Sequence, residues 1–409
     1  MSTWLIPRDE LTPEQLRAIE LDPQQHQMIV GAPGSGKTQI LPHRARYLCD
    51  RWNVKPESFQ LFVYTNVLKT YIRSAVQLLN LPQNCVTTFD DWCRTFYQQH
   101  VAGRPPWDSY SKQPDFAAIR AGVEQIVDSG RVKLPLFEFV LVDEAQDLEP
   151  MVFHILSRIS RHLTVCFDSK QQIFEQGSSE SEILEHLGLS KRNLTLLDAY
   201  RCSPYIARVA AQLIADSTEQ SQYLRQVRTE QAERQTPLLF RADSFISEKK
   251  RLIEALRERQ FKDQRIGVLF PLKRQVYGFA QGLRELGLEV ETQEKGELNF
   301  GSSRPKLITY ASAKGLTFDS VLLPRLVSES FPMMSSERIC RLLFVAITRA
   351  THWVYFSTTL GKELPELMPI LPLETERVLT VQTAGAPAET VLREEPPKPK
   401  PAAQALDFL

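Results

Sequence analysis

The sequence predicts an α/β protein with two successive parallel sheets. Short apolar runs that end in loop residues recur along the chain, which is typical of buried parallel strands. Helical patterns lie between several of these runs, and this alternation implies right-handed crossovers. There is no internal repeat of fixed short period, which argues against a solenoid or a propeller.

The expected elements follow the apolar runs in order. We expect strands at residues 27–30, 61–64, 137–142, 163–167, 237–240, 265–270, 306–310, 320–323 and 353–356. We expect helices between them at residues 40–49, 66–79, 205–215, 248–259 and 275–286.

A polar stretch at residues 176–181 and a turn near Ser190 separate the first set of strands from the second. We therefore expect a first domain at 1–196, with a short excursion at about 93–134, and a second domain at 197–375.

The last part of the chain, residues 376–409, differs from the rest. Four prolines lie among charged residues between 393 and 403, which predicts an extended, semi-rigid linker. Beyond it, Leu406, Phe408 and Leu409 form an apolar peptide with Gln404. It is similar to peptides that bind sliding clamps, although the spacing departs from the usual bacterial pattern. Another replication or repair partner, or packing on the protein's own body, stays open.

Composition excludes several classes of protein. The 409 residues are 43% hydrophobic and 24% charged, as in folded soluble proteins, and unlike collagen, disordered chains or disulfide mini-proteins. Lys and Arg together number 49, as do Asp and Glu, so the formal net charge is zero. A polyanion must therefore be bound by a local patch and not by a global field.

The six cysteines are scattered, with no C-x-x-C pair and no histidine at metal-ligand spacing. We interpret them as reduced packing residues; a catalytic cysteine stays open, because no base can be assigned to one. The first residues lack an apolar signal region, and no apolar stretch is long enough to cross a bilayer. We expect a soluble, cytoplasmic protein.

Residues 31–38 read G-A-P-G-S-G-K-T, which fits the phosphate-binding pattern G-x-x-x-x-G-K-[ST]. The segment follows a predicted strand and opens a predicted helix, the context in which backbone amides point at a phosphate. Lys37 would add positive charge, and the Thr38 hydroxyl would bind Mg²⁺. The expected phosphate contacts are Gly31, Gly34, Ser35, Gly36, Lys37 and Thr38.

A second predicted strand, at 137–142, leads directly into Asp143 and Glu144. Adjacent side chains on an extended backbone diverge, so one carboxylate can hold a metal while the other faces water. We assign Asp143 to Mg²⁺ and Glu144 to the role of general base. Such a pair is by itself often only a solvated loop, but the phosphate loop favours the catalytic interpretation.

With the phosphate loop, V-D-E-A-Q-D at 142–147 resembles the UvrD/Rep branch of superfamily 1 DNA helicases. Other segments resemble motifs of this family in its order: L-T-P-E-Q at 11–15, Y-T-N at 64–66, T-T-F-D-D-W at 87–92, F-D-S-K-Q-Q-I-F at 167–174, Y-R at 200–201, S-A-K-G-L-T-F at 312–318, and R-L-L-F-V-A-I-T-R-A at 341–350.

The resemblance implies two RecA-like domains with ATP in the cleft between them. It assigns Gln15 to the adenine edge, Tyr200 to stacking on adenine and Gly315 to the nucleotide site. Gln171 and Arg201 would reach the γ-phosphate, and Arg349 would be the arginine finger. The catalytic set is then Glu144, Lys37, Gln171, Arg201 and Arg349. The DNA contacts implied in the same way are Tyr64, Thr65, Asn66, Thr88, Phe89, Phe174 and Thr309.

Some residues depart from the family's pattern. Thr317 stands where an acidic residue is usual, and Glu175 to Gly177 replace the aromatic and basic residues beyond the coupling motif. Phe174 or Tyr64 could stack on a base instead, or could belong to the core. The usual insertions are reduced, and the excursion carries an aromatic and basic cluster at 104–112, suited to DNA contact or simply a surface loop.

These observations predict an ATP- and Mg²⁺-dependent helicase or translocase on single-stranded DNA, moving 3′ to 5′, in replication, repair or recombination. One alternative is a nucleotide-dependent switch or regulatory subunit that does not unwind. A second alternative is a P-loop kinase that acts on a small molecule. Such a kinase would not need Gln15, Gln171 or a second half that carries arginines.

Overall fold

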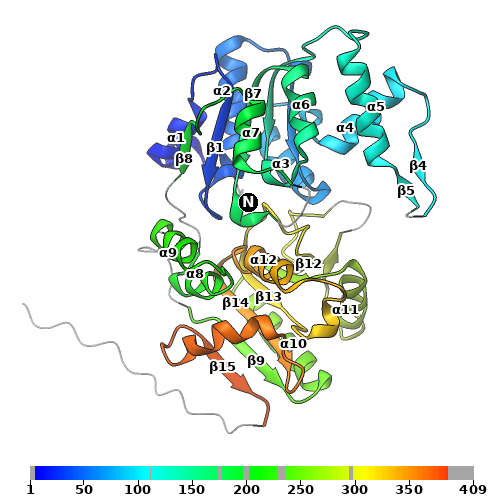
Figure 1. Ribbon diagram of the computed structural model, residues 1–409. Coiled ribbons are helices and arrows are strands. Elements are labelled where there is room, and N and C mark those ends of the chain that lie inside the picture. Colours follow the sequence, from blue (N-terminus) through cyan, green and yellow to red (C-terminus); the bar gives the residue numbers. More distant parts are fainter. Residues whose placement is uncertain are drawn as a thin grey trace, which may run out of the picture.

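A computed structural model describes residues 5–110, 112–172, 177–196, 202–227, 235–293 and 298–385. The chain forms two halves, each built on a parallel sheet flanked by helices (Figure 1). The predicted α/β fold with two successive RecA-like domains is thereby confirmed.

The first sheet has six parallel strands. From one edge to the other they are β3 (Val86–Thr88), β2 (Phe59–Val63), β6 (Phe137–Val142), β7 (Ser160–Phe167), β1 (Gln27–Gly31) and β8 (Leu194–Leu196). All residues of β2 are buried, as expected for a strand with both faces covered. Because all strands run in one direction, the loops that follow β1, β6 and β7 meet at one edge of the sheet.

Seven helices accompany this sheet. They are α1 (Pro13–Ile19), α2 (Lys37–Trp52), α3 (Asn66–Leu78), α4 (Phe89–His100), α5 (Phe116–Asp128), α6 (Pro150–Ile159) and α7 (Glu180–His186). Threonine side chains start three of them, because the hydroxyls of Thr12, Thr65 and Thr88 each accept a backbone N–H of the first turn.

The excursion at about 93–134, which begins within α4 and ends before the strand β6, is small. The helices α4 and α5 are joined by a two-stranded antiparallel hairpin, β4 (Trp107–Asp108) and β5 (Gln113–Pro114). Phe96, Ile119 and Val123 of the two helices are buried in the same core as the first sheet. The excursion therefore extends the first half and does not form a separate inserted domain.

The second sheet has seven parallel strands. In spatial order they are β11 (Glu291–Thr292), β12 (Lys306–Thr309), β10 (Ile266–Phe270), β13 (Phe318–Leu323), β14 (Ala350–Thr359), β9 (Leu238–Ala242) and β15 (Thr380–Thr383). The helices of this half are α8 (Pro204–Ala211), α9 (Ser217–Gln226), α10 (Phe245–Phe261), α11 (Lys273–Glu285) and α12 (Ser336–Ile347).

The second half extends beyond residue 375, where we expected the tail to begin. A 3₁₀ segment at Pro365–Glu374 leads into β15, which pairs with β9 in parallel. The residues of β15 are half-buried or exposed, so this edge strand carries no apolar run that the sequence could reveal. The predicted linker and apolar peptide lie outside the described residues.

The two halves pack directly against each other. Gly315 has a φ of +77°, and a Cβ at this position would lie 2.9 Å from the side chain of Leu68 on α3. The ring of Tyr71 on the same helix lies 4.8 Å from that of Phe300. One hydrophobic cluster contains residues from both halves, so the polar groups at their interface are held by a shared core.

In the part of the chain that the structure describes, no helix combines the length and apolar character needed to span a membrane.

Candidate nucleotide and nucleic-acid sites

The phosphate loop wraps over the end of β1 and the start of α2. Gly34 and Gly36 have φ values of +84° and +93°, the left-handed region that glycine adopts without strain. A Cβ on Gly36 would lie 2.2 Å from the amide of Gln15, and one on Gly31 would lie 2.4 Å from the Ser35 hydroxyl. The predicted glycines therefore allow a close turn that a larger residue would block.

Lys37 lies inside this loop and is 5% exposed. Its ammonium donates to the carbonyl oxygens of Gly31 at 2.5 Å and Ala32 at 3.1 Å, and lies 3.3 Å from a carboxylate oxygen of Asp168. The Ser35 hydroxyl is buried and has no hydrogen-bond partner in the described part of the chain. A buried cation and an unpartnered hydroxyl at a helix N-terminus fit a bound phosphate.

The predicted metal residues meet across the sheet. The Thr38 hydroxyl donates to a carboxylate oxygen of Asp143 at 2.9 Å. Burial, and then the neighbouring Glu144, raise the pKa of Asp143 to about 7. A hydroxyl and a carboxylate are oxygen ligands of the kind Mg²⁺ takes together with nucleotide phosphates, so this pair fits the ion. Among the described residues there is no cluster of three or more His, Cys, Asp or Glu side chains that could hold a metal alone.

Glu144 lies in a strained backbone position, with φ +54° and ψ +45°. This turn differs from the extended backbone from which the sequence analysis expected the side chains of Asp143 and Glu144 to diverge. Burial by itself raises the pKa of this carboxyl, but the cations Lys314, Lys37 and Arg349 together lower it below its ordinary value. The amide of Gln146 donates to the carboxylate at 2.5 Å, so the charged form is oriented as well as stabilised.

Arg349 crosses from the second half to the first. Its guanidinium donates to the side-chain oxygen of Gln171 at 2.7 Å, and it is 6% exposed. The amide of Gln171 in turn donates to Asp168, the same carboxylate that lies beside Lys37. A continuous chain of contacts therefore joins the predicted arginine finger to the phosphate-binding lysine.

The sequence analysis missed Lys314, which makes several polar contacts between the halves. Its buried ammonium forms an ion pair with Asp147, donates to the backbone oxygen of Gln171 at 2.5 Å and lies 3.5 Å from Glu144. The sequence could have identified this residue, because Lys314 belongs to the motif S-A-K-G-L-T-F at 312–318. Its partners are up to 170 positions away in sequence, and only the closed fold brings them together.

Gln15 lies against the phosphate loop. Its amide donates to the backbone oxygen of Ser35 at 3.1 Å, and its side-chain oxygen accepts from the backbone of Thr12.

Arg44, two turns after Lys37 on α2, is fully buried and donates to the carbonyl oxygens of Ile19 at 2.8 Å and Leu21 at 3.1 Å. The end of α1 is thus fixed to the helix that holds Lys37.

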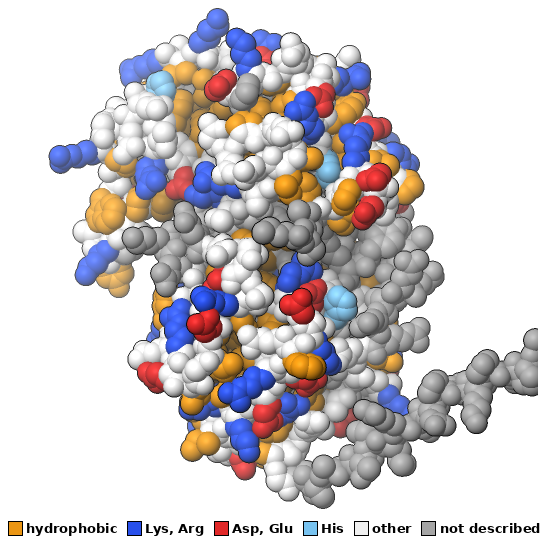
Figure 2. Space-filling view, turned by 180° about the vertical axis from the view of Figure 1, so that it is seen from behind, with side chains coloured by type: hydrophobic (Ala, Val, Ile, Leu, Met, Phe, Trp, Pro, Cys, Tyr) orange, Lys and Arg blue, Asp and Glu red, His pale blue; other side chains and the backbone are white. Residues whose placement is uncertain are grey.

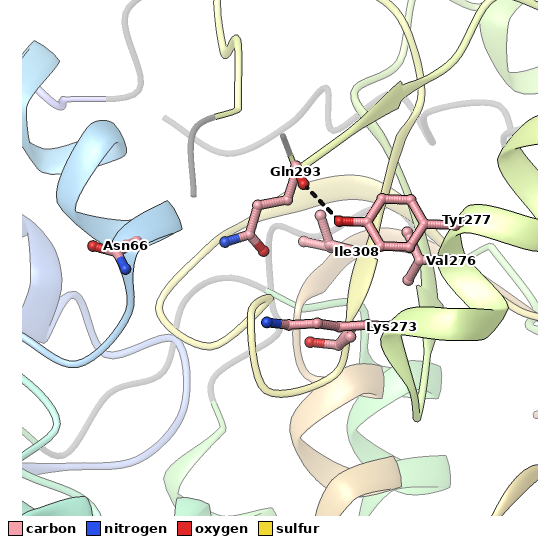
Figure 3. Close-up of a pocket in the computed structure, with 7 residues that line it drawn as sticks. Asn66, Lys273, Val276, Tyr277, Gln293 and Ile308 are labelled. Atoms are coloured by element: carbon pink, nitrogen blue, oxygen red, sulfur yellow. Dashed lines mark hydrogen bonds between the residues drawn. The ribbon is translucent and has the colours of Figure 1, made fainter. Parts of the chain in front are cut away.

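Two predicted DNA residues from different halves line one cavity of about 330 Å³ (Figure 3). Asn66 comes from the start of α3, and Thr309 from the end of β12. Lys273 and Gln293, which the sequence analysis did not select, extend from the second half toward Asn66. Lys273 follows a predicted strand and opens a helix, a signal that could have identified it. The hydroxyl of Tyr277, also in the wall, donates to the backbone of Gln293 at 3.2 Å.

The other predicted DNA residues have structural partners. Thr65 and Thr88 cap α3 and α4. Phe89 is 4% exposed, and its ring lies 5.5 Å from that of Phe62 in an edge-to-face contact, so its position leaves no face for stacking on a base. Tyr64 is half-buried, and burial, with Asp147 as the next cause, raises its pKa above the ordinary value.

Three predicted site residues, Phe174, Tyr200 and Arg201, lie outside the described residues. Gly315 is described, and a Cβ at this position would meet the side chain of Leu68 at the interface between the halves. Its assignment to the nucleotide stays a prediction.

Comparison with known proteins adds two family matches. Residues 11–136 match the UvrD/REP helicase N-terminal domain, and residues 291–361 match the UvrD-like helicase C-terminal domain. A solved structure, the C-terminal domain of a possible DNA helicase from Lactobacillus plantarum WCFS1, is 16% identical, with 45% of this chain and 98% of that chain covered and a TM-score of 0.35. No curated protein matches the chain. The first family match contains Gln15, Lys37 and Asn66, and the second contains Thr309, Lys314 and Arg349.

Proposed function

We propose that the chain, which carries both the UvrD/REP helicase N-terminal domain and the UvrD-like helicase C-terminal domain, is an ATP-dependent motor on single-stranded DNA. The proposed reaction is the hydrolysis of ATP to ADP and phosphate with Mg²⁺. The proposed movement is 3′ to 5′, as a helicase or translocase in replication, repair or recombination.

The observation that carries this proposal is the contact of Arg349 with Gln171. This hydrogen bond and the ion pair of Lys314 with Asp147 bring second-half side chains to the phosphate-loop side of the interface. Charge that develops on a transferring phosphoryl group would therefore be stabilised fully only while the halves are closed. That dependence is what a motor needs in order to couple chemistry to movement.

Each residue has a distinct task in the proposed reaction. Bound ATP would supply the phosphoryl group, and Mg²⁺ would neutralise part of its charge. The amides of the loop and Lys37 would bind phosphate oxygens, while Thr38 and Asp143 would hold the ion. Glu144, kept charged by its cationic neighbours, accepts a proton from the attacking water.

The proposed DNA site also spans the interface. Asn66 is on the first half, whereas Lys273, Gln293 and Thr309 are on the second, so a strand bound there touches both halves. Opening and closing of the interface would change the distance between these contacts and so shift the strand.

A nucleotide-dependent switch that does not unwind is the second candidate. The small excursion favours it, because the described residues between β3 and β6 form only α4, α5 and a short hairpin. Such a protein would hydrolyse ATP without separating strands.

Unwinding of duplexes with a single-stranded overhang tests the proposal and separates the candidates. A motor moving 3′ to 5′ separates the duplex with a 3′ overhang, and only with hydrolysable ATP. Unwinding from a 5′ overhang alone would contradict the polarity. DNA-stimulated hydrolysis without unwinding of either duplex would favour the switch or a pure translocase. A measurement of movement along single strands distinguishes these two.

A further inference from the structure

Two exposed aromatic side chains that have no role assigned so far lie on the β4–β5 hairpin. Trp107 is 63% exposed and Tyr110 is 96% exposed. Burial of large aromatic side chains is favourable, so leaving two of them in water within four residues is costly. Such exposed apolar groups typically mark interaction sites.

The hairpin presents these rings on a stiff support. Trp107 pairs with Pro114 across the two strands, and the backbone N–H of Asp115 donates to the carbonyl of Pro106 at 3.0 Å, which closes the base of the hairpin. The Asp108 carboxylate accepts the backbone N–H of Tyr110 at 2.9 Å and shapes the turn. Prolines fix φ, so little conformational entropy is lost when the rings bind a ligand.

The hairpin combines two cations with the rings, while its carboxylates, Asp108 and Asp115, accept backbone N–H groups. Arg104 and Lys112, on either side of Trp107 and Tyr110 in sequence, are both exposed. Hydrophobic and basic side chains gather at the edge of the first half where the hairpin lies (Figure 2). Aromatic rings beside cations are the combination that stacks on bases and contacts phosphates.

Base pairing restricts which nucleic acid fits. In a duplex the faces of the bases are covered by their neighbours, whereas an unpaired base presents a free face to a ring. The hairpin lies on the side of the molecule where α11 lies (Figure 1), and Lys273 and Tyr277 of α11 line the cavity assigned to DNA. We propose that Trp107 and Tyr110 stack on unpaired bases of the same strand after it leaves that cavity. This inference rests on the proposed function and extends its DNA site.

Binding of labelled oligothymidylates of increasing length tests the inference. The parent protein binds short oligothymidylates through the cavity alone and binds longer ones more tightly, because these also reach the hairpin. In the double variant Trp107→Ala/Tyr110→Ala, the gain with length disappears. We expect its affinity for long oligothymidylates to be at least about 30-fold weaker, because two stacking contacts of at least about 1 kcal/mol each are lost.

Two further variants control the measurement. Trp107→Phe keeps a ring and retains the gain with length, yet loses the quenching of tryptophan emission by long oligothymidylates. Phe261→Ala removes a ring that is 93% exposed at the end of α10, in the second half, and leaves binding unchanged.

The inference is overturned if the double variant binds long oligothymidylates as tightly as the parent, or if its affinities for short and long ones fall equally. The stimulation of ATP hydrolysis by short oligothymidylates tests the proposed function separately. A parent protein without that stimulation argues against the motor, whereas a stimulated parent with an unaffected double variant argues only against the hairpin contact.

Discussion

Lys37 and Glu144 belong to the same site but have different tasks, so their substitution separates nucleotide binding from chemistry. Lys37→Ala removes a cation that contacts phosphate already in the ground state, so it weakens nucleotide binding as well as turnover. Glu144→Gln removes only the proton acceptor. We expect turnover to fall by about 10²- to 10⁴-fold while the dissociation constant for nucleotide stays close to the parental value.

Nucleotide titration with steady-state turnover measures both effects. Near-parental hydrolysis by Glu144→Gln would remove this residue from the role of base. Equal nucleotide affinity in Lys37→Ala and the parent would contradict the phosphate contact of Lys37.

Arg349 acts from the second half, so its loss affects the closed state. Because its hydrogen bond reaches Gln171 and not the loop itself, Arg349→Ala leaves ATP affinity close to the parental value. Turnover falls on the order of 10³-fold, as for other arginine fingers. Arg338→Ala, an exposed arginine on the same helix α12, is the matched control and hydrolyses ATP normally. Hydrolysis at the parental rate in Arg349→Ala would show that the site is misassigned.

At the scale of elements, α1 depends on a residue of α2. Arg44 satisfies backbone carbonyls at the end of α1 and contacts Thr164 and His162 of β7. Burial lowers its pKa to about 10, so it stays charged at neutral pH, and its hydrogen bonds to described residues are made to backbone oxygens, a hydroxyl and an imidazole. A buried cation is tolerated only when its donors are satisfied, as they are here.

Arg44→Met leaves those carbonyls without a donor and loosens the helix that carries Gln15. We expect the free energy of unfolding to fall by about 2–4 kcal/mol, and ATP binding to weaken at temperatures where the variant is folded. Denaturant unfolding and nucleotide titration measure the two effects. Arg46→Met, on the same helix but exposed and paired with Asp50, serves as the control and changes stability by less than about 0.5 kcal/mol. Parental stability in Arg44→Met would contradict this account of α1.

Sequence patterns predicted elements well where burial produced a continuous apolar run. The nine expected strands correspond to β1, β2, β6, β7, β9, β10, β12, β13 and β14. The edge strands β3, β8, β11 and β15 and the hairpin strands β4 and β5 were missed, because strands of two to four residues carry no such run. Phe89 illustrates a different limit. An aromatic residue inside a motif can contact DNA or belong to the core, and only its packing reveals which role it has.

The same limit applies to the contacts across the interface. The phosphate loop and the carboxylates after β6 could be predicted, because each role depends on local sequence and its place in a parallel sheet. The reach of Lys314 to Asp147, and the position of Lys273 opposite Asn66, depend on how the two halves pack. No local pattern carries that information.

At the scale of the whole molecule, the apolar end of the tail is predicted to act independently of the motor. Leu406, Phe408 and Leu409 follow a Pro-rich spacer in the sequence. Deleting residues 404–409 leaves DNA-stimulated ATP hydrolysis unchanged and removes binding to a partner protein, with a purified sliding clamp as the first candidate. A lower melting temperature together with lower hydrolysis would instead show that the peptide packs on the motor. Unchanged clamp binding would contradict the proposed contact.

The central claim is that one interface between the two halves both hydrolyses ATP and holds a single strand. The most direct test is the steady-state rate of ATP hydrolysis with and without single-stranded DNA, in the presence of Mg²⁺. A strand that contacts Asn66 and Lys273 together favours the closed interface that brings Arg349 to Gln171, so the account predicts a clear rise in turnover when the strand is added. A rate that is the same with and without DNA would contradict it.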